Sequence, residues 1–158
     1  MAGPPDDEKH AAMIAGLDPD DVADLLVRAA LEHDDVARAV RLAAADDGDR
    51  LQVLRQAVDA SLRTRRFLDY WASSRWAADA APVVDALRQE AERRQSKELV
   101  ALIERGIGHL VKVLLTADDS NGDIGSLAHE LLQLHAEVCD AGVADPAALA
   151  KWMVRFTF

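Results

Sequence analysis

The chain has 158 residues, enough for one domain with its own hydrophobic core, and a formal net charge of −10 at pH 7. Direct binding to nucleic acid is not expected of so acidic a protein, because the phosphate backbone attracts clustered bases. The first 50 residues hold 13 acids and five bases, whereas residues 51–100 hold seven acids and nine bases. The bases are therefore concentrated in the middle of the chain.

The single cysteine, Cys139, cannot form an internal disulfide, which favours a reducing compartment. The N-terminal sequence MAGPPDDEKH is acidic and polar, unlike a signal peptide. No apolar run approaches the roughly 20 residues that a membrane-spanning helix needs. We therefore expect a cytoplasmic protein without membrane contact. The abundance of Ala, Asp and Arg with little Lys is typical of a GC-rich bacterial genome.

Residues 1–15 begin with proline and charge and are predicted to be a flexible acidic tail, followed by one helical domain over residues 16–158. Two helices are predicted to start at Asp18-Pro19 and at Asp34-Asp35, because Asp caps a helix and Pro suits its first turn. The sequence Asp47-Gly48-Asp49 is expected to break the second helix. A third helix follows it, with apolar residues at helical spacing.

A fourth helix is expected to be capped by Ser73 or Ser74 and to run to about Arg94. Pro82 lies inside this span and is expected to kink or restart the helix, because proline lacks a backbone donor. Ser96 is predicted to cap the fifth helix, which carries a long aliphatic stripe.

Gly106 interrupts that aliphatic stripe, at a cost of about 0.5–1 kcal/mol relative to alanine. We expect a neighbouring helix to approach closely there. The sixth helix is predicted to bury a stripe from Ile124 to Val138 and to end at Gly142, and Asp145-Pro146 starts a seventh. Since no strand pattern occurs, the chain is predicted to be all-α: a bundle or short α-solenoid of about seven helices packed as helix hairpins.

The acidic turn TADDSNGD, before the sixth helix, has the composition of a calcium loop but lacks its ligands. With Gly122 at the sixth position, the first and twelfth positions are Ala117 and Ala128, where a calcium loop has carboxylates. We expect a simple helix–helix turn instead. In it, Gly122 adopts a positive φ and Ser120 or Asp123 caps the next helix.

No catalytic or cofactor motif stands out in the chain. His135 and Cys139 lie four residues apart, a spacing that two metal ligands could use, but no second cysteine or paired histidine completes a site. We expect a hydrogen-bonded core histidine and a small buried thiol. His129-Glu130 begins like a zinc-protease helix, but Gln133 stands where the second histidine belongs. The chain is therefore predicted to be non-enzymatic, with no cofactor and no metal.

The segment RTRRFLDYWASS, residues 63–74, interleaves bases with aromatic residues. Three interpretations are open. In the first, Phe67, Tyr70 and Trp76 fill a joint between two helix pairs. In the second, the segment contacts a protein partner. In the third, it binds single-stranded nucleic acid by charge and stacking. The candidate partner-contact residues are Arg65, Arg66, Asp69, Tyr70, Arg75 and Trp76.

Three parts of the sequence carry a family resemblance. They are Arg65–Tyr70 followed by Trp76-Ala77, Asp118–Gly125 followed by Leu131, Leu134-His135 and Cys139, and Asp145-Pro146 followed by Leu149-Ala150. Together they resemble an uncharacterised bacterial helical domain that occurs downstream of SWIM zinc fingers. The resemblance implies a solenoid-like interaction region without an assigned activity. The finger's Cys-x-Cys and Cys-x-His pairs are absent, so its zinc and DNA binding are not carried over.

The sequence as a whole predicts a non-enzymatic scaffold domain that binds an unidentified protein partner, with a homodimer left open. The alternative is an accessory domain of a nucleic-acid-associated complex, which the SWIM association and the local arginines motivate. A third class, a hydrolase whose acids converge only in space, has no support beyond the abundance of Asp and Glu.

Overall fold

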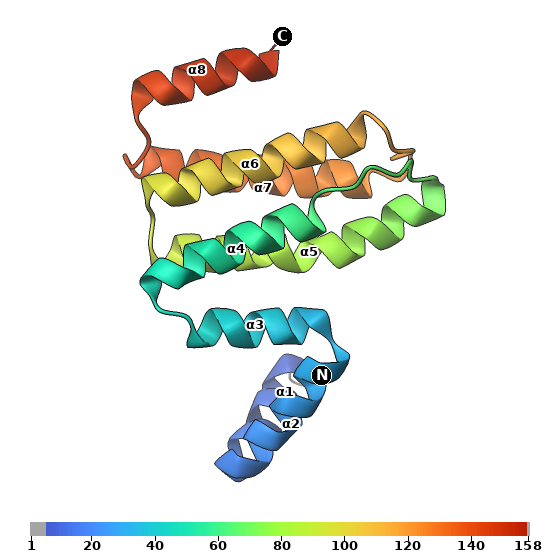
Figure 1. The fold of residues 1–158 in the computed structure, drawn as a ribbon, viewed down its shortest axis with the longest axis vertical. Coiled ribbons are helices and arrows are strands. Elements are labelled where there is room, and N and C mark those ends of the chain that lie inside the picture. The colour runs from blue at the N-terminus through green and yellow to red at the C-terminus, as the bar shows by residue number, and fades with distance from the viewer. Residues whose placement is uncertain (1–5, 158) are drawn as a thin grey trace, which may run out of the picture. The chain divides into compact units, whose positions relative to one another are not determined.

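The structure, a computed structural model, describes the backbone of residues 6–157 and is all-α, which confirms the predicted fold class (Figure 1). Eight helices and no strand lie in this range. The helices are α1 (Asp6–Ala15), α2 (Pro19–Glu32), α3 (Asp34–Ala44), α4 (Asp47–Ser61), α5 (Tyr70–Arg93), α6 (Lys97–Leu114), α7 (Asp123–Asp140) and α8 (Pro146–Thr157).

The helices group into two compact units, residues 1–44 and residues 45–158, whereas the sequence analysis placed all of residues 16–158 in one domain. Helix α1 also occupies most of the segment predicted as a flexible tail, and the first five residues of that tail lie outside the described range. The second unit, residues 45–158, contains all the candidate partner-contact residues.

The first unit, helices α1 to α3, has little buried apolar surface. The side chain of Asp18 accepts a hydrogen bond from the Asp20 backbone N–H at 2.9 Å, so the predicted Asp-Pro start of α2 is confirmed. Helix α2 lies against α3 but buries none of its residues, and Leu42 is the one buried side chain described in this unit. Apolar side chains such as Leu25 and Leu31 remain exposed.

The second unit is a four-helix bundle of α4 to α7, followed by α8. Helix α7 contacts α5 and α6, and α4 contacts the same two helices (Figure 1). The side chains at the centre are almost entirely aliphatic and have no exposed surface: Leu54, Val58, Leu62, Val83, Leu87, Leu99, Ile103, Ile107, Leu110, Ile124, Leu131 and Val138. Burial of this aliphatic surface is the main stabilising contribution in the bundle.

The starts of α4 and α5 differ from the sequence prediction. The side chain of Asp46 accepts hydrogen bonds from the Gly48 and Asp49 backbone N–H groups, so Asp47-Gly48-Asp49 forms the first turn of α4 instead of a break. Asp69, not Ser73 or Ser74, caps α5, by accepting from the Ala72 N–H at 2.9 Å. Because the cap comes earlier, both serines lie inside the helix.

Helix α5 continues through Pro82 for 24 residues, so the proline does not restart it. Pro82 is exposed, and the carbonyl group left without a helical donor can therefore bind water. Ser96 caps α6 as predicted, by accepting from the Leu99 N–H at 3.1 Å.

Gly106 is buried where α6 meets its neighbours, as expected. A Cβ atom at this position would lie 3.3 Å from Leu62 Cδ1 of the adjoining α4 end and 3.3 Å from Leu131 Cδ2 of α7. Both distances are shorter than ordinary carbon–carbon contacts, so the missing side chain permits the close approach. The close packing at this position therefore offsets the unfavourable helix propensity of glycine.

Gly122 adopts the left-handed conformation with φ 77°, as predicted for the acidic turn. The carboxylate that caps α7 belongs to Asp119, which accepts from the Ile124 N–H at 2.9 Å and from the Gly125 N–H at 2.8 Å. The prediction that Ser120 or Asp123 caps this helix is therefore wrong. The acids of the turn serve in part to order its backbone.

Candidate functional site

Two connections lie side by side at one end of the bundle, the α4–α5 loop and the α6–α7 turn. The backbone N–H of Asp118 donates to the carbonyl of Leu68 at 2.8 Å, across 50 residues of sequence. The side-chain amide of Asn121 donates to the hydroxyl of Ser74, and the buried hydroxyl of Ser73 donates to the carbonyl of Leu68 at 3.4 Å. These contacts hold the backbones of the loop and the turn in place, and so fix the positions from which the neighbouring side chains project.

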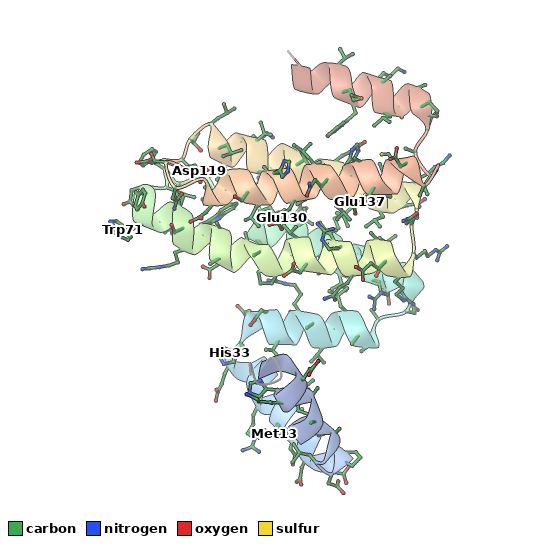
Figure 2. The ribbon with its side chains drawn as sticks, turned by 180° about the vertical axis from the view of Figure 1, so that it is seen from behind. Met13, His33, Trp71, Asp119, Glu130 and Glu137 are labelled. Carbon is green, nitrogen blue, oxygen red and sulfur yellow. The ribbon has the colours of Figure 1, made fainter. Side chains whose placement is uncertain are left out.

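Large apolar side chains project from this fixed end of the bundle. The exposed fractions are 71% for Phe67, 77% for Trp71 and 80% for Leu115, and Tyr70 is 43% exposed. Figure 2 shows Trp71 and Asp119 at the same end of the bundle. The rings of Tyr70 and Trp71 meet edge to face, with centroids 5.2 Å apart. The interpretation that Phe67 and Tyr70 plug a helix joint is therefore wrong.

Four arginines occur in the same part of the chain, three in the α4–α5 loop and one on α5: Arg63, Arg65, Arg66 and Arg75. All four are exposed, and none has an ion pair within the described part of the chain. Arg75 lies four residues after Trp71 on α5, so both side chains lie on the same helix face. We call this region the end surface, defined by Arg63, Arg65, Arg66, Phe67, Tyr70, Trp71, Arg75 and Leu115.

The end surface contains four of the six predicted partner-contact residues and four residues that the prediction omitted. Asp69 is exposed but is engaged as the cap of α5, and Trp76 is partly buried within that helix. The omitted members are Arg63, Phe67, Trp71 and Leu115. Leu115 follows the end of the α6 stripe directly, which is the one sequence signal that could have indicated its exposure.

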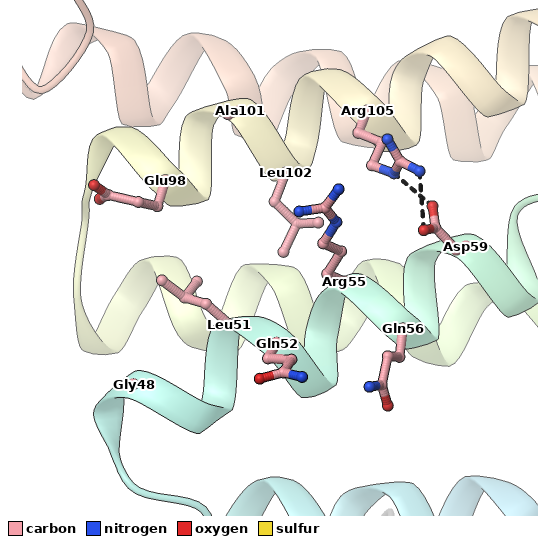
Figure 3. Close-up of a pocket in the computed structure, with 10 residues that line it drawn as sticks. All are labelled: Gly48, Leu51, Gln52, Arg55, Gln56, Asp59, Glu98, Ala101, Leu102 and Arg105. Atoms are coloured by element: carbon pink, nitrogen blue, oxygen red, sulfur yellow. Dashed lines mark hydrogen bonds and ion pairs between the residues drawn. The ribbon is translucent and has the colours of Figure 1, made fainter.

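A groove of about 910 Å³ lies between α4 and α6 (Figure 3). Asp59 and Arg105 form a bidentate pair across it, with Nη2 and Oδ2 2.9 Å apart, and His109 Nε2 lies 3.0 Å from Asp59 Oδ1. The Arg105 hydrogen bond holds the pKa of Asp59 at about 2, against the opposing effect of burial. Asp59 is therefore a fixed anion at neutral pH and not a proton donor. Figure 3 shows Arg55 reaching into the same groove.

His135 is a buried, hydrogen-bonded core residue, as predicted. Its Nε2 lies 3.2 Å from Glu104 Oε1, and the Trp152 ring of α8 lies against the imidazole with centroids 4.4 Å apart. The Sγ atom of Cys139 is 3.7 Å from Nε2 and 3.9 Å from Nδ1, so it is nearly equidistant from the two ring nitrogens. Cys139 is half-buried, somewhat less than expected.

Burial raises the pKa of the Cys139 thiol, and the charges of Glu104 and Asp140 raise it further. The thiol is therefore protonated at neutral pH and a weak nucleophile. Among the residues that the structure describes, no group of three His, Cys, Asp or Glu side chains could hold a metal ion. In the same part of the chain, no helix is both long and apolar enough to cross a membrane.

Comparison with known proteins does not assign the chain to a family: no family model matches it, and neither a curated protein nor a solved structure is significantly similar to it. The resemblance to the helical domain downstream of SWIM zinc fingers therefore stays a prediction.

Proposed function

We propose that this chain is a non-enzymatic scaffold domain that binds another protein through its end surface. The observation that carries the proposal is the exposure of Phe67 and Trp71, more than two thirds each, on a backbone fixed by the Leu68–Asp118 hydrogen bond. Exposed aromatic side chains on a rigid base are typical of binding surfaces, because Trp, Tyr and Arg dominate contact energies.

The energetics of such a contact are favourable. An aromatic side chain buries roughly 150–250 Å², and burial contributes about 25 cal/mol per Å². Covering the exposed parts of Phe67 and Trp71 would then contribute roughly 3 kcal/mol each, before the costs of association. The fixed backbone reduces one of those costs, since little ordering is left to occur on binding.

A second candidate is an accessory domain of a nucleic-acid-associated complex, which the four unpaired arginines beside aromatic rings favour. Against it, the acidic turn is joined to the same end of the bundle, and the carboxylates of Asp118 and Asp123 are exposed there. The protein-binding function is therefore the better supported one.

Site-specific photocrosslinking in the native cell tests the proposal. A photoreactive phenylalanine analogue replaces Phe67, and a matched control carries it at Leu132, an exposed apolar residue of α7. We expect a crosslinked protein from position 67 that is absent from position 132 and is lost when Trp71 is changed to Ser. The melting temperature should stay unchanged, because Trp71 is mostly exposed.

Two results would overturn this function. One is a crosslink that persists in the Trp71→Ser variant, which would mean that the trapped protein does not recognise the end surface. The other is a set of crosslinked proteins that is the same from positions 67 and 132, since such proteins would be random neighbours.

A further inference from the structure

We infer that the protein segment that binds the end surface is acidic and apolar, a short stretch in which Asp or Glu residues flank large hydrophobic ones. This inference rests on the proposed function, in which the end surface binds a protein. Three features of the bundle carry it: the unpaired arginines, their interleaving with aromatic residues, and the position of the acidic turn.

Four exposed arginines lie within 13 residues of sequence at the end surface, although the protein as a whole is acidic. Elsewhere in the bundle, Arg50 pairs with Glu90 at 2.8 Å, Arg88 with Glu137 at 3.6 Å, and Arg105 with Asp59, whereas the exposed Arg55 has no ion pair among the described residues. The four arginines of the end surface have none among the described residues. This group of four like charges favours an acidic partner.

Cations and aromatic rings alternate over a short distance at this surface. Arg65 and Arg66 immediately precede Phe67, and Arg75 shares a helix face with Trp71. A partner that offers only apolar side chains would leave the guanidinium groups uncompensated, and one that offers only acids would leave the rings in water. Guanidinium groups also bind carboxylates in a bidentate manner. The fitting segment therefore carries both kinds of residue.

The acidic turn disfavours a nucleic acid as the ligand. The hydrogen bond from Asp118 to Leu68 holds this turn beside the loop that carries the arginines, and Asp118 and Asp123 are exposed. A phosphate backbone that runs along the end of the bundle would meet these carboxylates, whereas a short peptide can avoid them. Tyr70 and Trp71 also meet at an interplanar angle of 88°, which does not form the stacked platform that successive bases use.

A random peptide library displayed on phage, with peptides of about 12 residues, tests the inference on the full chain. We expect the selected peptides to carry net negative charge and at least two large apolar residues. Their affinity, measured by fluorescence anisotropy with synthetic peptides, should fall at least tenfold in the Arg65→Glu/Arg66→Glu variant. It should also fall as salt rises from about 50 to about 500 mM.

The matched control is Arg55→Glu/Lys151→Glu, which makes the same change in net charge at exposed residues outside the end surface. We expect peptide affinity in this variant within about twofold of the wild-type value. A peptide whose acids are changed to Lys should prefer the Arg65→Glu/Arg66→Glu variant over the wild type. Equal melting temperatures among these proteins exclude unfolding as the cause.

The outcomes separate the partner chemistry from the proposed function. Neutral apolar peptides that lose binding in Phe67→Ser/Trp71→Ser, but not in the arginine variant, would overturn the acidic chemistry and leave the binding surface standing. Peptides that bind both variants like the wild type would overturn both. A library without enrichment, or a single-stranded DNA oligonucleotide that binds through the same arginines, would also overturn the acidic-peptide inference.

Discussion

Two glycines of α6 offer a matched test of how the bundle packs. A Cβ atom at Gly106 would lie 3.3 Å from Leu62 Cδ1 and from Leu131 Cδ2, whereas one at Gly108 would meet nothing within 4 Å. Both leucines have no exposed surface, so other side chains enclose them and oppose their displacement. The same substitution should therefore have different effects two residues apart.

Replacing a helical glycine with alanine stabilises a protein by about 0.5–1 kcal/mol where the side chain fits. We expect the Gly108→Ala variant to gain this amount in free energy of unfolding. At Gly106, displacement of the two buried leucines offsets the gain, so we expect that variant to be about 1–2 kcal/mol less stable than Gly108→Ala. Gly106→Leu adds three further carbons and should be about 1–3 kcal/mol less stable than the wild type.

Urea denaturation, monitored by circular dichroism, measures these differences. The comparison requires that the slope of the free energy of unfolding against urea concentration is the same in all variants. Combining Gly106→Leu with Leu62→Ala should cost less than the sum of the single changes, because the new side chain can occupy the space that Leu62 leaves. If the two alanine variants were equally stabilised, or Gly106→Leu were as stable as the wild type, the close approach at Gly106 would be disproved.

Three further predictions follow from the acidic turn and the groove. Asp119→Ala should lower the free energy of unfolding by about 1–2 kcal/mol, since two backbone N–H groups of α7 lose their acceptor, while Asp123→Ala in the same turn should change it by less than about 0.5 kcal/mol. The pKa of Asp59 is about 2 in the folded protein and about 4 in the unfolded chain, so its pairing with Arg105 stabilises the fold above about pH 4 and this contribution disappears as the pH falls to about 2. Because the pair is partly exposed, the wild type should lose about 1 kcal/mol over that interval relative to Asp59→Asn, and equal losses in urea titrations of the two proteins would contradict the pairing. Calcium should not bind specifically at the acidic turn, because Ala117 and Ala128 replace its first and last ligands, and saturable micromolar binding in calorimetry would show otherwise.

Some helix starts could be predicted because they carry unambiguous signals. Asp18-Pro19 and Ser96 each have one residue placed to cap, and the structure confirms both. The start of α5 was misplaced because Asp69 and the two serines that follow it are all good caps. Which of the three residues caps the helix depends on the position of the Leu68 backbone. Asp118, 50 residues away, holds that backbone by a hydrogen bond.

The candidate site could be predicted as a segment but not as a surface. The interleaved bases and aromatics at residues 63–76 indicated a contact region, yet periodicity does not tell an exposed aromatic residue from a buried one. Phe67 lies in a loop, so no helical face assigns its direction. Leu115 joins the surface through tertiary structure alone, since it follows a helix distant in sequence.

The Leu68–Asp118 hydrogen bond also decides where the chain can be engineered. An insertion or a fused reporter in the α4–α5 loop or the α6–α7 turn would have to separate two backbones that hold each other in place. At the opposite end of the bundle, the exposed turn at Gly142 joins α7 to α8. A tag placed at this turn should leave the bundle folded and the aromatic end open to partners.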